Sequence, residues 1–123
     1  GGANAVSAIN TVVGMSINHR SRFSDIYTTF GGLSGPAIKP VGLACVHKVY
    51  NAVNIPIIGI GGIVNSTDVI EYFLAGSCSV QVGTANFRNP GITEIILNEL
   101  NNYLDEKGID SISSLIGSVK THD

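Results

Sequence analysis

The sequence has little charge, and neither sign dominates. Asp, Glu, Lys and Arg make up only 13% of the 123 residues, against roughly 25% in a typical globular domain. Apolar residues make up 44% and the mean hydropathy is +0.30, which excludes disorder caused by high charge and low hydrophobicity. Seven basic residues stand against nine acidic ones. No run of Lys and Arg is present, so we expect no nucleic-acid partner.

Long apolar runs and closely spaced cysteines are also missing. The run over residues 55–60 is far shorter than the roughly 20 residues that a membrane span needs. The first residues are not basic and lead into no apolar signal core, so we expect no membrane partner and a soluble, cytoplasmic protein. Cys45 and Cys78 lie far apart in apolar segments. They form no CxxC redox or zinc motif, and we expect two buried free thiols.

Glycine, by contrast, is abundant: 15 of the 123 residues are Gly, well above the average of roughly 7%. Most of the excess falls in short clusters. Such clusters mark loops whose backbone has special demands rather than low-complexity sequence.

Hydrophobic periodicity alternates between short strands and helices along the chain. Apolar, β-branched runs predict buried strands at 5–9, 55–60 and 79–82. Helical spacing predicts helices over 37–52, 65–76, 91–107 and 112–119. The first helix is indicated by Val41, Ala44, Cys45, Lys48, Val49 and Ala52. This alternation is typical of parallel βα units with right-handed crossovers.

The connection over residues 10–35 has no sustained period. A connection of that length in a compact chain is usually functional. Val12–Ile17 and Asp25–Phe30 have some strand character, so we expect that they pair as a hairpin within it.

Polar or glycine residues follow each predicted strand: Asn10-Thr11, Gly61-Gly62 and Gly83-Thr84. The carboxyl ends of parallel strands meet at one rim, where ligands bind. Paired glycines let backbone N–H groups approach an anion, and the helix that follows residue 62 is expected to add its positive N-terminal dipole. The alternative for a single Gly-Gly pair is a tight turn. Two pairs on consecutive strands predict a phosphate-group site.

A three-stranded parallel sheet leaves two unpaired edges and two faces to cover. A (β/α)8 barrel needs about 250 residues, and its phosphate site commonly follows strands seven and eight. We therefore interpret residues 1–123 as one α/β segment, the C-terminal part (about strands 6–8) of a (β/α)8 TIM barrel, without a second domain. A small flavodoxin-like fold is the alternative.

Candidate acids and bases are few. Asn10 and Thr11 are uncharged and suit the orientation of a polar planar ligand rather than proton abstraction. Residues 31–36 are either a cradle for one edge of a cofactor or a flexible loop. No His lies at triad spacing and no cluster has metal-ligand spacing. Most acidic residues, Asp68 and Glu71 among them, are expected on solvated helix faces. The sequence thus predicts a binding segment with no catalytic residue and no metal.

Three motifs closely resemble the dihydroorotate dehydrogenase family, in its NAD-linked class 1B form. They are GGLSGPAIKP at 31–40, IPIIGIGGI at 55–63 and VQVGTANF at 80–87. Residues 8–11 fit the same family, and the similarity runs over essentially the whole chain.

The resemblance implies a (β/α)8 barrel with non-covalent FMN that oxidises dihydroorotate to orotate in pyrimidine biosynthesis. It implies an iron–sulfur, FAD-containing partner subunit that passes electrons to NAD, within a homo-oligomer or heterotetramer. It also implies FMN contacts from Ile9, Gly35, Gly61, Gly62, Gly83 and Thr84, the last four at the phosphate. Asn10 and Thr11 are implied to bind the orotate ring.

In this family the general base is a cysteine on an earlier loop, and a lysine on an earlier strand contacts both flavin and substrate. Neither region is in this sequence, so we expect the chain alone to be inactive. Two alternatives stay open: a phosphate-binding half-barrel module without redox activity, and a related flavin barrel such as dihydropyrimidine dehydrogenase.

Overall fold

A three-stranded parallel sheet forms the centre of the computed structural model, which describes residues 1–122. Its strands are β1 (Val6–Ala8), β4 (Ile57–Ile60) and β5 (Ser79–Gln81), in the order β1-β4-β5. Ala8 pairs with Gly59, which pairs with Val80 on the other side. The three predicted strands are therefore confirmed, each shorter than its apolar run.

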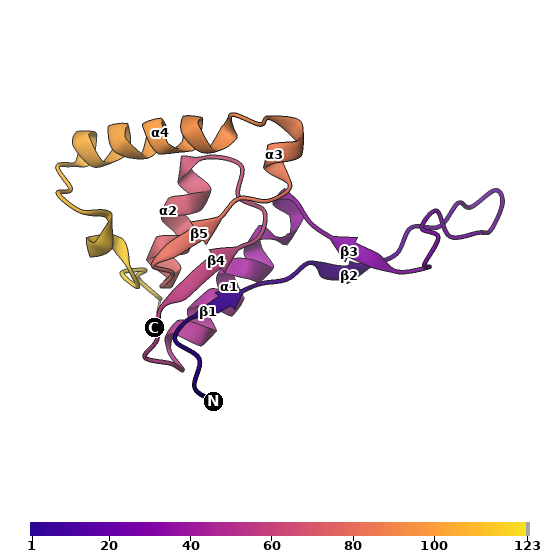
Figure 1. Ribbon diagram of the computed structural model, residues 1–123, viewed down its shortest axis with the longest axis horizontal. Helices are drawn as coiled ribbons and strands as arrows, with labels where there is room; N and C mark the ends of the chain where they lie inside the picture. The colour runs from indigo at the N-terminus through magenta and orange to yellow at the C-terminus, as the bar shows by residue number, and fades with distance from the viewer. Residues whose placement is uncertain (123) are drawn as a thin grey trace.

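Helices follow each strand of this sheet (Figure 1). They are η1 (Pro36–Ile38), α1 (Lys39–Tyr50), α2 (Ser66–Ala75), α3 (Ala85–Arg88), α4 (Ile92–Lys107) and η2 (Ile112–Leu115). α1 and α2 pack against the sheet and each other, and α4 and η2 pack on α2. The predictions for α1, α2 and α4 are confirmed. The expected closing helix is only a 3-10 turn, and α3 was not predicted.

The core lies between the sheet and these helices. Its most buried side chains are Val46 of α1, Ile57 of β4, and Val69 and Tyr72 of α2. α1 turns Gly42 and Val46 inward, whereas Val41, one of the residues that indicated this helix, is 46% exposed. The sequence thus predicted the helix but not its buried face.

A separate two-stranded arm leaves the body of the molecule after β1 (Figure 1). β2 (Val12–Gly14) pairs antiparallel with β3 (Gly31–Leu33). The predicted pairing with Asp25–Phe30 is wrong, because this segment forms a turn. The Thr29 amide donates to the Ile26 carbonyl at 2.9 Å, and Thr29 has a φ of +70°. The hairpin exists, but its second strand is the glycine run.

Both cysteines are free, as predicted, yet only one is shielded. Cys45 is half-buried, whereas Cys78 is exposed. The expectation of two buried thiols is therefore wrong for Cys78, which directly precedes β5 at an edge of the sheet. No helix within residues 1–122 has both the length and the apolar character needed to cross a membrane.

Candidate functional site

A cavity of about 190 Å³ opens at the carboxyl ends of the three parallel strands. Its wall comes from the ends of β1, β4 and β5 and from the segment that enters η1. All eight predicted site residues line it: Ile9, Asn10, Thr11, Gly35, Gly61, Gly62, Gly83 and Thr84. The predicted convergence of the strand ends is thus confirmed, while the ligand that each residue binds stays a prediction.

The Gly61-Gly62 loop after β4 requires glycine for two reasons. Both residues have positive φ, +132 and +71, a region that side chains other than Gly rarely adopt. A Cβ at Gly62 would also lie 2.8 Å from the Gly35 carbonyl oxygen and 2.9 Å from the backbone nitrogen of Lys39. Within residues 1–122, the amide N–H groups of Gly61 and Gly62 donate to no protein acceptor. Two donors are therefore left for a ligand.

The second glycine site follows β5. A Cβ at Gly83 would meet nothing within 4 Å, so the backbone here borders open space. The Thr84 hydroxyl donates to the Ser34 hydroxyl oxygen at 2.8 Å. This bond joins the end of β5 to the segment before η1 and holds two walls of the cavity together.

The unpredicted helix α3 begins directly after Thr84 and ends at Arg88. Arg88 lines the cavity and is exposed. In the part of the chain that the structure describes, it makes no ion pair. In the sequence, Arg88 is a single cation four residues after Thr84, and this position was the available sign of a role at the predicted phosphate site. Arg88 is a functional candidate that the sequence reasoning missed.

Asn10 and Thr11 lie at the end of β1 and are both exposed. The Thr11 amide donates to Asn10 Oδ1 at 2.7 Å. The Ile9 amide donates to the Ile60 carbonyl at 2.9 Å and ties this segment to the end of β4. The peptide bond between Ala8 and Ile9 is cis. The Thr11 hydroxyl also donates to Asn10 Oδ1 at 3.5 Å, and both side chains lie at the rim of the cavity, beside the glycine loops.

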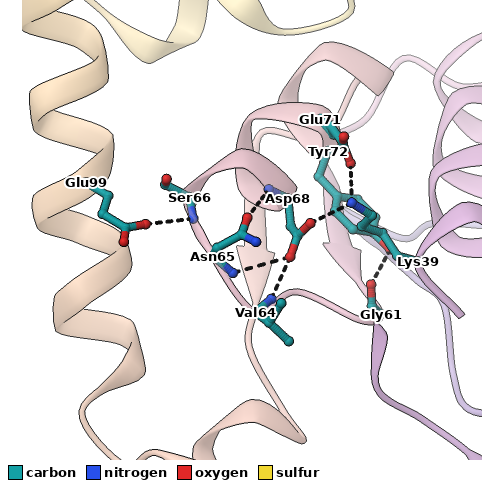
Figure 2. Close-up of polar contacts among 9 residues, drawn as sticks. All are labelled: Lys39, Gly61, Val64, Asn65, Ser66, Asp68, Glu71, Tyr72 and Glu99. Carbon is teal, nitrogen blue, oxygen red and sulfur yellow. Dashed lines mark hydrogen bonds and ion pairs between the residues drawn. The ribbon is translucent and has the colours of Figure 1, made fainter. Parts of the chain in front are cut away.

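The N-terminus of α2 was expected to add its positive dipole to the anion site, and this stays a prediction; side chains of the protein bond two of its first amides. Asn65 Oδ1 accepts from the Asp68 amide at 2.9 Å, and Asp68 Oδ2 accepts from the amides of Val64 (2.8 Å) and Asn65 (3.3 Å). Glu99 Oε2 accepts from the Ser66 amide at 3.2 Å (Figure 2). Side chains of the protein itself therefore satisfy the amides of Ser66 and Asp68 in the first turn of this helix.

Asp68 also corrects the expectation that the acidic residues are solvated, because it is only 3% exposed. Its Oδ1 lies 2.6 Å from Lys39 Nζ, which also lies 2.7 Å from Glu71 Oε2. The bond to Asp68 and then that to Glu71 raise the pKa of Lys39. The spacing of Asn65 and Asp68 is that of a capping box and was the available signal. The ion pair joins α2 to the start of α1, beside the cavity wall.

Tyr72 of α2 lies behind the Gly61-Gly62 loop and is fully buried. Its hydroxyl donates to the Gly61 carbonyl at 2.8 Å (Figure 2). It also lies 3.3 Å from the Ile60 carbonyl. Burial, and then the negative charge of Asp68, raise the pKa of Tyr72 to about 12. The hydroxyl therefore remains a neutral donor.

The chemistry of the cavity wall suits binding rather than proton transfer. Arg88 is the single ionisable side chain among the lining residues that the structure describes. No group of three or more His, Cys, Asp or Glu in residues 1–122 could hold a metal ion. The arrangement offers backbone donors, one cation and two neutral polar side chains to a ligand.

Comparison with known proteins identifies the family. The family model described as "Dihydroorotate dehydrogenase" matches residues 2–104. The "Dihydroorotate dehydrogenase B (NAD(+)), catalytic subunit" of Desulforamulus reducens is 53% identical over 117 residues, which is 95% of this chain and 38% of the relative. The protein of the same name from Bacteroides fragilis is 45% identical over 119 residues, 97% of this chain and 39% of the relative. The chain thus spans about two fifths of the length of these curated relatives.

The fold agrees with this result. The crystal structure of DHODH from Eimeria tenella, in complex with ferulenol, superposes with a TM-score of 0.77 at 30% sequence identity. The match covers 95% of this chain and 31% of that structure. By sequence and by fold, the chain belongs to the dihydroorotate dehydrogenase family.

Proposed function

We propose that this chain supplies the FMN-phosphate site and part of the orotate site of an NAD-linked dihydroorotate dehydrogenase. It forms about strands six to eight of the (β/α)8 barrel of that enzyme, which oxidises dihydroorotate to orotate in pyrimidine biosynthesis. One observation carries the proposal: three strand ends converge on one cavity in which two glycine loops leave backbone N–H groups unbonded. The B (NAD(+)) names of the relatives support the same assignment.

The residues present fit a phosphate dianion. The unbonded amides of Gly61 and Gly62 are suitable donors, and Gly83 borders open space into which a phosphate can reach. Arg88 supplies a positive charge, and no carboxylate of the described residues lines the cavity to repel an anion. Arginine suits phosphate recognition because its planar fork can donate two parallel hydrogen bonds.

The apolar part of the cavity fits a planar ring system. Ile9, Ile38 and Ile63 contribute hydrocarbon surface next to the polar donors, a combination that ligand sites commonly show. When bound, FMN supplies the hydride acceptor for dihydroorotate, and the protein supplies position and electrostatics. The residues of this chain bind the cofactor and restrict its position.

Asn10 and Thr11 orient the substrate in this proposal. The Thr11 amide, at 2.7 Å, and the Thr11 hydroxyl, at 3.5 Å, both donate to Asn10 Oδ1. The Asn10 Nδ2 group therefore remains as a donor, and the Thr11 hydroxyl oxygen as an acceptor, for the polar edge of orotate. Neither group is a base at neutral pH. We assign proton abstraction to a residue outside this chain, and we expect the chain by itself to show no turnover.

The partner in this proposal is an iron–sulfur, FAD-containing subunit that transfers electrons to NAD, in a heterotetramer or with a homo-oligomer of the catalytic subunit. Support comes from the relatives, whose name marks them as catalytic subunits of a larger enzyme. The arm adds support, because the segment between its two strands exposes two aromatic side chains, Phe23 by 76% and Tyr27 by 104%. A cytoplasmic location stays a prediction.

A chimera tests the proposal. This chain replaces the matching segment of the Desulforamulus reducens catalytic subunit, to which it is 53% identical, and the unmodified subunit serves as control. We expect a yellow protein that binds FMN and forms orotate when its electron-transfer subunit is present. A chimera that folds but stays colourless while binding inorganic phosphate would indicate a phosphate-binding module instead. A yellow chimera that uses dihydrouracil and not dihydroorotate would indicate a related flavin barrel.

A further inference from the structure

The Tyr72 hydroxyl is the one side-chain donor that reaches the Gly61-Gly62 loop from inside the described part of the protein. It comes from α2, on the side of the loop that faces the core, and it donates to the Gly61 carbonyl at 2.8 Å. Tyr72 is fully buried and does not line the cavity. It therefore touches no ligand itself, and its influence passes through the loop.

The geometry of a peptide unit shows what this influence is. The Gly61 carbonyl and the Gly62 amide belong to one planar, trans peptide, in which C=O and N–H point in opposite directions. Because Tyr72 fixes the carbonyl toward the core, the Gly62 N–H is fixed away from the core. That N–H has no acceptor within residues 1–122, and Gly62 lines the cavity.

This constraint matters because glycine peptides rotate easily. Gly61 and Gly62 both have positive φ and no side chain to limit them. A flip of their shared peptide would replace the N–H by a carbonyl oxygen, which repels an anion. The raised pKa of Tyr72, about 12, keeps its proton in place over the physiological range.

α2 holds the loop at two points (Figure 2). Tyr72 holds its beginning at Gly61, and Asp68 holds its end by accepting from the amides of Val64 and Asn65. Asp68 is fixed in turn by Lys39 at 2.6 Å. The loop is thus anchored to one helix at both ends, and the segment between them faces the cavity.

We propose that Tyr72 is a positioning residue for phosphate binding, which holds the Gly61-Gly62 peptide in the orientation that presents the Gly62 N–H to the phosphate of FMN. This inference rests on the proposed function. It predicts that the hydroxyl matters for FMN, which carries the phosphate, and not for riboflavin, which has the same ring system without it.

The test uses Tyr72→Phe in the protein that carries this chain or in the chimera above. Tyr103→Phe is the matched control, because the same atom is removed from a half-buried tyrosine whose hydroxyl makes no hydrogen bond within residues 1–122. We expect Tyr72→Phe to weaken FMN binding about fivefold, the equivalent of one ordinary hydrogen bond. Riboflavin affinity should stay within about twofold of the unsubstituted protein.

A second variant separates packing from peptide orientation. A Cβ at Gly42 would overlap the Tyr72 hydroxyl oxygen, so Gly42→Ala combined with Tyr72→Phe fills the space that the lost oxygen leaves. The double variant should recover stability but not FMN affinity, because its methyl group cannot donate a hydrogen bond.

Each result has one meaning. The positioning role is supported if Tyr72→Phe weakens binding of FMN but not of riboflavin, and if the double variant shows the same loss of FMN affinity. Equal losses for FMN and riboflavin, or a Tyr72→Phe variant that binds like Tyr103→Phe, overturn it and leave the proposed function standing. If the unsubstituted protein binds no FMN, the proposed function and the positioning role both fall.

Discussion

The Tyr72 hydroxyl occupies the place that a methyl group would take at Gly42. α1 and α2 approach each other here, and a Cβ at Gly42 would overlap the hydroxyl oxygen and lie 3.2 Å from Tyr72 Cζ. Glycine is costly inside a helix, by about 1 kcal/mol relative to alanine. Its presence in the first turns of α1 is explained by the room that the buried hydroxyl needs.

A double-mutant cycle on this pair should show strong coupling. Alone, Gly42→Ala should destabilise the protein by about 1–3 kcal/mol through overpacking. Combined with Tyr72→Phe, the same substitution should be neutral or stabilising by up to about 1 kcal/mol, because only the helix propensity is left. Chemical denaturation of the four proteins measures the coupling. Additive effects would contradict the steric account.

The two glycine sites should respond differently to a methyl group. Gly62→Ala places a Cβ 2.8 Å from the Gly35 carbonyl oxygen at φ +71, so we expect a loss of about 1–3 kcal/mol from backbone strain alone. Gly83→Ala meets nothing within 4 Å and should leave the free energy of unfolding unchanged.

Both substitutions should weaken FMN binding, the second without loss of stability. Thermal unfolding without ligand, followed by FMN titration, distinguishes the two effects. A Gly83→Ala protein with full FMN affinity would show that the phosphate does not approach the end of β5.

Sequence reasoning located the strand ends because two simple rules applied there. Apolar runs bounded by glycine predict buried parallel strands, and parallel strands place their carboxyl ends together. Gly61, Gly83 and Asn10 followed from these rules alone. The rules say nothing about length, and each strand is shorter than its apolar run.

What the sequence did not reveal depends on tertiary contacts. In the sequence, Asp68 resembles an ordinary surface acid, because its ion-pair partner Lys39 lies 29 positions earlier and comes close only in the folded protein. The arm was assigned the wrong second strand because residues 25–30 have β propensity, and the hydrogen bonds of a turn outweigh that propensity. Gly31–Leu33 carries almost no propensity and pairs because β2 lies opposite.

The two carboxylates that share Lys39 should differ in their contribution to stability. Asp68 is buried and accepts two backbone amides besides the ion pair, so Asp68→Ala should cost about 2–3 kcal/mol. Glu71 has a side chain that is 38% exposed, and Glu71→Ala should cost less than about 1 kcal/mol. Urea unfolding at neutral pH gives both values. Equal losses would show that the backbone bonds of Asp68 contribute little.

Stability should decline at alkaline pH, and the direction follows from two shifts. The pKa of Lys39 is raised above 10.5 by Asp68 and Glu71, and burial raises that of Tyr72 from 10.0 to about 12. Both groups hold their protons more tightly in the folded than in the unfolded chain. Their contribution is therefore complete below about pH 10 and is lost as the pH rises toward 12.

Unfolding free energies measured across this range should fall, and the fall should be smaller in Tyr72→Phe. Tyrosinate absorbance of the folded protein should show one late-titrating tyrosine, which disappears in the same variant. An unchanged titration curve would contradict the burial of this hydroxyl.

Arg88 should contribute to affinity and not to stability. It is exposed and unpaired within residues 1–122, so Arg88→Ala should leave the unfolding free energy within about 0.5 kcal/mol of the original. Its charge lies at the same cavity as Gly83 and Thr84. A hydrogen bond to a charged group contributes about 1.5–3 kcal/mol, so FMN affinity should fall at least about tenfold.

The loss should become smaller as salt increases, because salt screens the attraction between an exposed cation and an anion. Riboflavin binding should not change, since it lacks the phosphate. Arg88→Lys is the informative control: it keeps the charge and removes the fork, so partial recovery identifies charge as the main contribution and no recovery identifies paired hydrogen bonds. Equal affinities for FMN in all three proteins would place Arg88 outside the site.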